Sequence, residues 1–278
     1  MRKYQFTNKL MFAIVMHDPI ACRGLIEKLF PNKKVKAIYF PGKNGEQEVA
    51  DAKEVLKHYT EEVEKTIITG LESKSVRLDV LFEDDDAIYD IELQLEREEE
   101  IPKRSRYYHT AMARNSLRKG EPYGKLKRSY VIFVCCFDAF GMDEPIYRFE
   151  MYDKNLQLNL NDGSSTIILN TKCSKEKIPE ELEAFYAFVD SGRVDENDML
   201  VKYLDERVEE ANNNEEVDRI MTLEEEMIIR YDRGLRKGKE EGAAEEKRKI
   251  AKNLKKLGVG ITEIEKATGL TNKEIEAL

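Results

Sequence analysis

Three polar side chains in one short segment, Asp90, Glu92 and Gln94, are suited to metal-ion chemistry. They alternate within the sequence AIYDIELQ, and alternate residues of a strand point to the same face of a sheet. Asp79 lies in the preceding segment RLDV, and a hairpin of suitable register brings it near Glu92. Converging carboxylates with a further polar group bind Mg²⁺, which prefers oxygen ligands and retains waters that a phosphate can replace. Such an ion can lower the pKa of a bound water and neutralise charge that develops on a phosphate.

The charge around these residues is unevenly distributed. Residues 83–100 carry ten acidic side chains and one Arg, a local charge of −9, whereas residues 101–130 carry nine basic side chains and one Glu, a local charge of +8. The acidic segment repels itself unless a cation is bound, which favours a metal site. The alternative interpretation is that the alternating acids form a solvated face of a hairpin.

The basic segment combines cationic and aromatic side chains. Those nearest its start are Lys103, Arg104, Arg106, Tyr107, Tyr108 and His109. Phosphate donors beside aromatic faces are the composition expected of a nucleic-acid-binding surface. A charged helix that only pairs with the acidic segment is the alternative. A cation site next to a surface for a polyanion is what a metal-dependent nuclease needs.

Hydrophobic patterning predicts an α/β layered domain. The apolar run SYVIFVCCF at residues 129–137 is typical of a central strand that is covered on both faces. Expected strands are at residues 34–40, 75–83, 87–94, 146–152, 156–160 and 166–170. Expected helices are at residues 10–30 with a break at Pro19, at 46–71, and at 104–117 with Gly120 as C-cap, followed by helices to the C-terminus.

The C-terminal segment differs in composition, so we expect a first domain at 1–222 and a charged helical tail at 223–278. Gly234, Gly238 and Gly242 recur every fourth residue in a charged, solvated helix. Thr262 with Glu265, and Thr271 with Glu274, are each expected to form a capping box that opens a short helix, with Gly269 as a C-cap between them. The pair hints at a helix-turn-helix, although its second helix is too short for a recognition helix.

Length and composition constrain the class of protein. The 278 residues can bury a core without disulfides, and 41% hydrophobic residues argue against disorder. The four cysteines have neither disulfide-framework nor zinc-site spacing, which favours a reducing, cytoplasmic location. We expect no membrane-spanning segment, because the longest apolar run is far shorter than a bilayer requires. The net charge of −9 alone argues against nucleic acid, but the +8 segment provides a local binding surface.

Several motifs together resemble one family. RLDV, IELQ, RSRYYHTAM, GEPYGKLKRSYVIFVCCFDAFG and IILNTK occur in the order and spacing found in the recombination-promoting nuclease (Rpn) family. Its members are also described as PD-(D/E)XK nuclease family transposases. The resemblance runs from TNKLMFAIVMHDP near the start into the tail. It implies a restriction-endonuclease-like fold, a mixed sheet flanked by helices, in an enzyme that cleaves DNA with Mg²⁺ or another divalent cation and is linked to recombination and mobile elements.

The resemblance also implies roles for individual residues. Asp79 and Glu92 would be the catalytic metal ligands, with the Leu93 carbonyl as a third ligand. Gln94 stands where most PD-(D/E)XK enzymes have Lys, and it would orient the attacking water because an amide cannot act as a base. Nucleic-acid contacts would come from Lys103, Arg104, Arg106 and Tyr108. A homodimer is expected, since cutting both strands needs two sites or two visits.

Two departures from the family pattern support a second hypothesis. Asn8 is followed by Lys9, where the family usually has an acidic ligand, and Asp18 and Glu27 are weaker substitutes. The helix expected at residues 46–71 is also longer than the family pattern. The alternative function is therefore a catalytically inactive nuclease fold that binds nucleic acid or protein.

Overall fold

The computed structural model describes residues 3–41, 47–48, 79–97 and 99–278. The chain divides into two compact units, Met1–Asp218 and Arg219–Leu278, which we describe separately. The domain boundary near residue 222, drawn from composition, remains a proposal.

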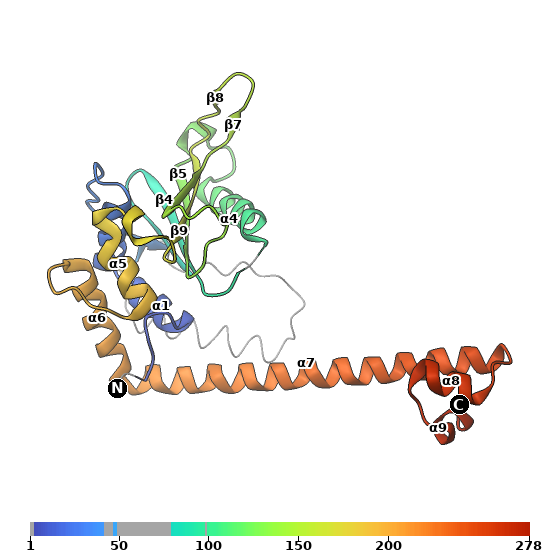
Figure 1. Ribbon diagram of the computed structural model, residues 1–278. Helices are drawn as coiled ribbons and strands as arrows, with labels where there is room; N and C mark the ends of the chain where they lie inside the picture. The colour runs from blue at the N-terminus through green and yellow to red at the C-terminus, as the bar shows by residue number, and fades with distance from the viewer. Residues whose placement is uncertain (1–2, 42–46, 49–78, 98) are drawn as a thin grey trace. The chain divides into compact units, whose positions relative to one another are not determined.

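A five-stranded mixed sheet forms the centre of the first unit (Figure 1). Its strands, in spatial order, are β3 (Val80–Glu83), β4 (Ala87–Gln94), β5 (Arg128–Cys135), β9 (Ser164–Asn170) and β6 (Ile146–Phe149). β4, β5 and β9 are parallel, while β3 and β6 are antiparallel to their neighbours. The prediction of a buried central strand at residues 129–137 is confirmed, because β5 is the middle strand.

The β3–β4 hairpin is held by its acidic turn. Asp84 Oδ1 accepts hydrogen bonds from the backbone N–H groups of Asp86 and Ala87, both at 2.8 Å, and Asp84 Oδ2 accepts one from the Tyr89 hydroxyl at 2.9 Å. This turn sets the register, which pairs Val80 with Ile91. Asp79, one residue before Val80, therefore lies opposite Glu92.

Helices cover both faces of the sheet. They are α1 (Lys9–Met16), α2 (Pro19–Leu29), α4 (Ile101–Ser116), α5 (Glu180–Ser191) and α6 (Met199–Asn212), with the short 3₁₀ turns η1 (Tyr123–Lys125) and η2 (Lys175–Lys177). α4 lies on one face and α1, α5 and α6 on the other, where α2 joins them (Figure 1). The predicted break at Pro19 is confirmed, since Asp18 caps α2 and Pro19 occupies its first turn.

Apolar side chains attach α4 to the sheet. Ile101, Tyr108 and Met112 of α4 pack on a set of buried residues that includes Val131, Phe133, Cys135, Tyr147 and Ile168. The Tyr108 and Phe133 rings stack with centroids 6.3 Å apart. This packing fixes the rotation of α4 about its axis, and so decides which of its polar side chains face β4.

Several predicted boundaries are wrong. Residues 34–40 do not form one continuous strand. The Val35 N–H donates to the Glu27 side chain, Tyr39 forms an isolated antiparallel bridge with Glu83, and Phe40 belongs to β1 (Phe40–Pro41). β1 pairs with β2 (Gln47–Glu48), which lies within the helix expected at residues 46–71. The remainder of that expected helix, residues 46 and 49–71, lies outside the described residues. α4 begins at Ile101, not 104, and its C-cap is Leu117, not Gly120.

A small ribbon interrupts the chain between β6 and β9. It consists of β7 (Tyr152–Asp153) and β8 (Leu158–Asn159), which pair antiparallel. The strands expected at residues 146–152 and 156–160 are therefore shorter than predicted, and the first is split between β6 and β7. The strand expected at 166–170 is confirmed as the greater part of β9.

The C-terminal helices are α7 (Glu215–Lys256), α8 (Ile261–Thr268) and α9 (Asn272–Glu276). Buried Ala251, Ile264, Leu270 and Ile275 form a small core in the second unit. The capping box of Thr271 and Glu274 is confirmed. The one expected at Thr262 is wrong, because α8 is capped by Gly260 and Thr262 lies inside its first turn. No helix in the described part of the chain is long and apolar enough to cross a membrane.

Candidate active site

The alternating polar residues of β4 lie beneath α4. Asp90, Glu92 and Gln94 are 0%, 1% and 3% exposed. The parallel register places Asp90 beside Val131, Glu92 beside Phe133 and Gln94 beside Cys135, which share the face that α4 covers. The prediction that the three point one way is therefore confirmed. The alternative of a solvated acidic face is wrong for these three residues, because all of them are buried.

The hairpin brings Asp79 and Glu92 together, as its predicted geometry required. The Asp79 backbone N–H donates to Glu92 Oε1 at 3.0 Å, and the Leu93 N–H donates to Asp79 Oδ2 at 3.3 Å. The Glu92 carboxylate is thus oriented by the backbone of Asp79, and the Asp79 carboxylate by the backbone of Leu93, the residue that follows Glu92. The two acids of RLDV and IELQ lie at one end of the hairpin in a fixed relative orientation.

Arg104 of α4 joins this cluster. Its Nη2 donates to Glu92 Oε2 at 2.8 Å and its Nη1 donates to Gln94 Oε1 at 2.8 Å. Tyr108, one turn further along α4, accepts from Arg104 Nε at 3.1 Å and from Nη2 at 2.8 Å. The guanidinium carbon also lies 5.8 Å from the centroid of the Phe133 ring. One side chain therefore fixes Glu92 and Gln94 at once.

The carboxylates share a buried space with little compensating positive charge. Burial, together with the charge of Asp79, raises the pKa of Glu92 to about 8, although Arg104 favours its ionised form. Burial, together with the charges of Glu92 and Asp79, raises the pKa of Asp90 well above its usual range. Neither carboxyl oxygen of Asp90 has a hydrogen-bond donor among the described residues. Acids that crowd together in a buried space repel one another when they are ionised, so the cluster favours an additional cation.

The donor set fits a hard divalent cation. Asp79 and Glu92 supply carboxylate oxygens, and Leu93 between Glu92 and Gln94 supplies a backbone carbonyl. Within the described ranges, no three His, Cys, Asp or Glu side chains are grouped so that they alone could hold a metal ion. A few protein oxygens completed by water and phosphate are the usual ligands of Mg²⁺, whereas zinc takes four nitrogen or sulfur ligands at structural sites.

Comparison with known families assigns the chain to one of them. The family described as PD-(D/E)XK nuclease family transposase matches residues 43–245, more than half of the chain. The chain belongs to this family. No curated protein and no solved structure matches it. The resemblance drawn from the motifs is confirmed, as is the α/β fold with a mixed sheet flanked by helices.

The matched region contains all four residues expected to contact nucleic acid, and the structure separates them into two pairs. Arg104 and Tyr108 face the carboxylates, and Tyr108 is 8% exposed. Lys103 and Arg106, which lie on another side of α4, are exposed to solvent. This division follows from the rotation of α4 about its axis. Lys103 and Arg106 are therefore the exposed members of the set, whereas Arg104 is partly buried and Tyr108 is buried.

The substitutes for an N-terminal acidic ligand have other partners. Asp18 accepts hydrogen bonds from the backbone of Ile20 and Ala21 and from the Tyr203 hydroxyl. Glu27 accepts from the backbone of Val35, and Lys9 is exposed in the first turn of α1. Both acids thus stabilise helix ends and loops of this PD-(D/E)XK domain. Neither makes a contact with Asp79 or Glu92 in the part of the chain that the structure describes.

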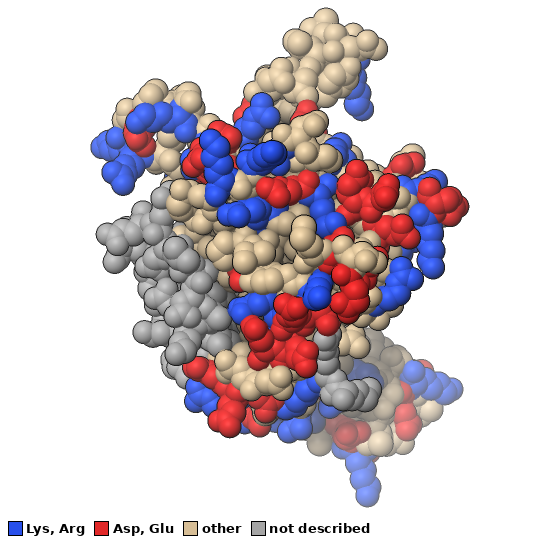
Figure 2. Space-filling view, turned by 90° about the vertical axis from the view of Figure 1, so that its left-hand side faces the viewer, with Lys and Arg blue, Asp and Glu red and all other residues tan. Residues whose placement is uncertain are grey.

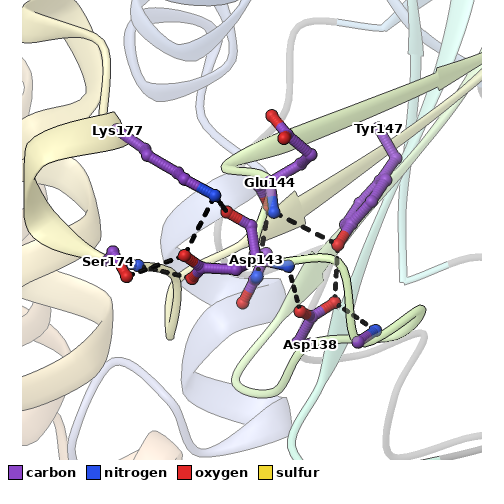
Figure 3. A network of polar contacts seen from close by, with 8 residues as sticks. Asp138, Asp143, Glu144, Tyr147, Ser174 and Lys177 are labelled. Carbon is purple, nitrogen blue, oxygen red and sulfur yellow. Dashed lines mark hydrogen bonds and ion pairs between the residues drawn. The ribbon is translucent and has the colours of Figure 1, made fainter.

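A polar network joins the loops that follow β5 and β9, at the same end of the sheet as Gln94. Asp143 accepts from the Ser174 N–H and hydroxyl, both at 2.7 Å, and pairs with Lys177 at 3.0 Å (Figure 3). The Ser174 donors and Lys177 hold the pKa of Asp143 at about 2. Asp138 in turn accepts from the Tyr147 hydroxyl at 2.7 Å. The donors satisfy both acids, so this network braces loops beside the site and leaves no open cation site of its own.

The surface charge is mixed on the face that Figure 2 shows, where Lys and Arg side chains are interspersed with Asp and Glu side chains. A broad basic surface does not cover this face.

Sequence reasoning missed two features of the site. Asp90 was recognised as sharing a face with Glu92, but it was not among the expected site residues, although its alternation with Glu92 and Gln94 is the signal that identifies it. Arg104 was expected to contact phosphate, and its pairing with Glu92 was not foreseen. The spacing of Arg104 and Tyr108, four residues apart on one helix, is the available signal for their contact.

Proposed function

We propose that this member of the PD-(D/E)XK nuclease family is a metal-dependent DNA endonuclease that hydrolyses phosphodiester bonds in the cytoplasm. The observation that carries the proposal is the pairing of Asp79 with Glu92 at the end of the hairpin, beside the buried Gln94 and below the basic helix α4. A buried acidic cluster that Arg104 neutralises only in part, and a helix with exposed cations, support the assignment to such an enzyme. We also propose a link to recombination and mobile elements, which the description of the family as a transposase supports.

The proposed roles follow the contacts. Asp79, Glu92 and the Leu93 carbonyl would hold the Mg²⁺ ion, which would supply an acidified water and positive charge to offset that of the phosphate. Gln94 holds the attacking water, because the bond from Arg104 fixes its amide while leaving the NH₂ group and a lone pair of Oε1 for further bonds. Lys103 and Arg106 bind phosphates of the DNA from the exposed side of α4. A homodimer would provide a second site for the complementary strand.

A plasmid-nicking assay tests the proposal. Purified wild type should nick supercoiled DNA with Mg²⁺ and lose that activity in chelator. Asp79→Asn and Glu92→Gln should each reduce nicking by roughly a hundredfold or more, since each removes a charged metal ligand. Asp85→Asn is the matched control: this turn residue is an exposed acid, and its substitution should leave nicking unchanged. Equal nicking by wild type and Asp79→Asn would exclude the assignment of the site.

The same assay tests the alternative of a catalytically inactive binding module. The exposed Lys9 and the ion pair between Arg104 and Glu92 are the observations that favour it. Retardation of DNA on a gel, with no nicking in Mg²⁺ or Mn²⁺, would establish the module and refute the nuclease. Light scattering of the same samples measures whether the protein is a dimer.

A further inference from the structure

We infer that Arg104 is an exchangeable partner of Glu92: its guanidinium contacts Glu92 before a divalent cation binds, leaves Glu92 when the cation arrives, and then binds the phosphate of the substrate. This inference rests on the proposed function. It goes beyond the proposed function by giving Arg104 two positions, one on Glu92 before a cation binds and one on the substrate phosphate afterwards.

Arg104 stands between Glu92 and solvent. The side chain of Glu92 is 2% exposed, whereas that of Arg104 is 25% exposed. Glu92 Oε1 already accepts the Asp79 N–H, and Oε2 accepts Arg104 Nη2. A cation that enters from solvent therefore meets the guanidinium before it reaches the Oε2 atom, and the two compete for the same oxygen.

Electrostatics makes the exchange favourable. A divalent cation beside a guanidinium in a site of low polarity is repelled, so both cannot contact Glu92 at low cost. Arg104 is nevertheless needed in the absence of metal, because Asp79, Asp90 and Glu92 are three acids crowded together with two of them fully buried. In the described part of the chain, Arg104 is the cation within ion-pair distance of Glu92. Its departure is compensated only when a stronger cation takes its place.

Tyr108 and Gln94 provide the anchor for the second position. Tyr108 accepts from both Nε and Nη2 of Arg104, and Gln94 accepts from Nη1. These contacts do not involve Glu92, so they can persist when Nη2 leaves it. The released N–H would then be free to donate to a phosphate oxygen of the substrate. Arginine suits this role because its planar fork matches phosphate oxygens.

Cation binding to the full-length protein without DNA tests the inference. Mn²⁺ alone is titrated calorimetrically into wild type, Arg104→Gln, Arg104→Lys and Lys103→Gln. Removing the competing charge should make Arg104→Gln bind Mn²⁺ roughly fivefold or more tightly than wild type. Arg104→Lys retains a charge and should stay close to wild type. Lys103→Gln, which removes a neighbouring exposed charge on α4, is the matched control and should also change affinity little.

The nicking assay supplies the second readout. Arg104→Gln should nick DNA roughly a hundredfold more slowly than wild type, because a hydrogen-bond donor to the phosphate is lost. This loss is expected even though the variant binds the divalent cation more tightly. Adding Glu92→Gln to Arg104→Gln should abolish the gain in affinity, which shows that the titrated site is the one described. A thermal melt of each variant in chelator establishes that it is folded.

The outcomes separate this inference from the proposed function. If wild type nicks DNA with Mg²⁺ but Arg104→Gln binds Mn²⁺ equally or more weakly, Arg104 only positions Glu92 and the exchange is wrong, while the nuclease assignment stands. If Arg104→Gln binds more tightly and nicks as fast as wild type, the phosphate-binding position is wrong. If no variant binds Mn²⁺ and wild type does not nick, the proposed function fails and the inference fails with it.

Discussion

At the scale of the residue, Glu92 links the site to the stability of the fold. Its pKa rises from 4.5 to about 8 in the folded protein, chiefly through burial. Between these values the unfolded chain releases a proton that the folded protein retains, so the free energy of unfolding should fall as the pH rises from about 4.5 to about 8. Glu92→Gln removes this ionisation. We expect the variant to lose less stability than wild type over that pH range, as measured by urea unfolding in chelator. Parallel pH profiles for the two proteins would contradict the raised pKa.

Tyr108 gives a second prediction at this scale. Tyr108→Phe keeps the ring against Phe133 and removes the oxygen that accepts two bonds from Arg104. The half-buried guanidinium then has fewer partners, so we expect the free energy of unfolding to fall by roughly 1–2 kcal/mol. Nicking should also decrease, because Arg104 is less well oriented. Tyr107→Phe is the matched control, since Tyr107 is 53% exposed on the same helix. Equal effects of both substitutions would show that the Tyr108 hydroxyl does not orient Arg104.

At the scale of the element, the β3–β4 hairpin positions the site through its turn. Asp84 is 3% exposed and accepts from two backbone N–H groups, the Tyr89 hydroxyl and Lys33, which lies 2.9 Å away. Asp84→Ala leaves these donors unsatisfied and should lower the free energy of unfolding by roughly 2–3 kcal/mol, measured by urea unfolding. Asp85→Ala, next to it and exposed, should change it by less than about 0.5 kcal/mol. If the two variants are equally stable, the turn does not fix the hairpin.

The sequence predicts an element well when the interactions that form it lie within a few residues of one another, and poorly when they join distant parts of the chain. The hairpin and β5 are predictable, because alternation, an Asp-rich turn and a run of β-branched residues each act within a few residues. The rotation of α4 is not predictable in this way: it is set by Ile101, Tyr108 and Met112 packing on β5, which is distant in the sequence. For that reason Asp79, Glu92 and Gln94 could be brought together from the pattern, whereas the pairing of Arg104 with Glu92 could not. The failed cap at Thr262 is instead a local error of position, since Gly260, two residues earlier, caps α8.

At the scale of the whole molecule, the net charge of −9 restricts how the protein meets DNA. Most of its surface should repel a polyanion, so binding should be local to α4 and fall steeply with salt. The logarithm of the association constant, measured by fluorescence anisotropy in Ca²⁺, should fall linearly with the logarithm of salt concentration.

Lys103→Gln and Arg106→Gln should each make that slope shallower by roughly one unit, because each removes one phosphate contact. Lys34→Gln removes an exposed charge outside α4 and should leave the slope unchanged. If all three variants retained the wild-type slope, the exposed side of α4 would not be the nucleic-acid surface, and DNA would have to reach the carboxylates from another direction.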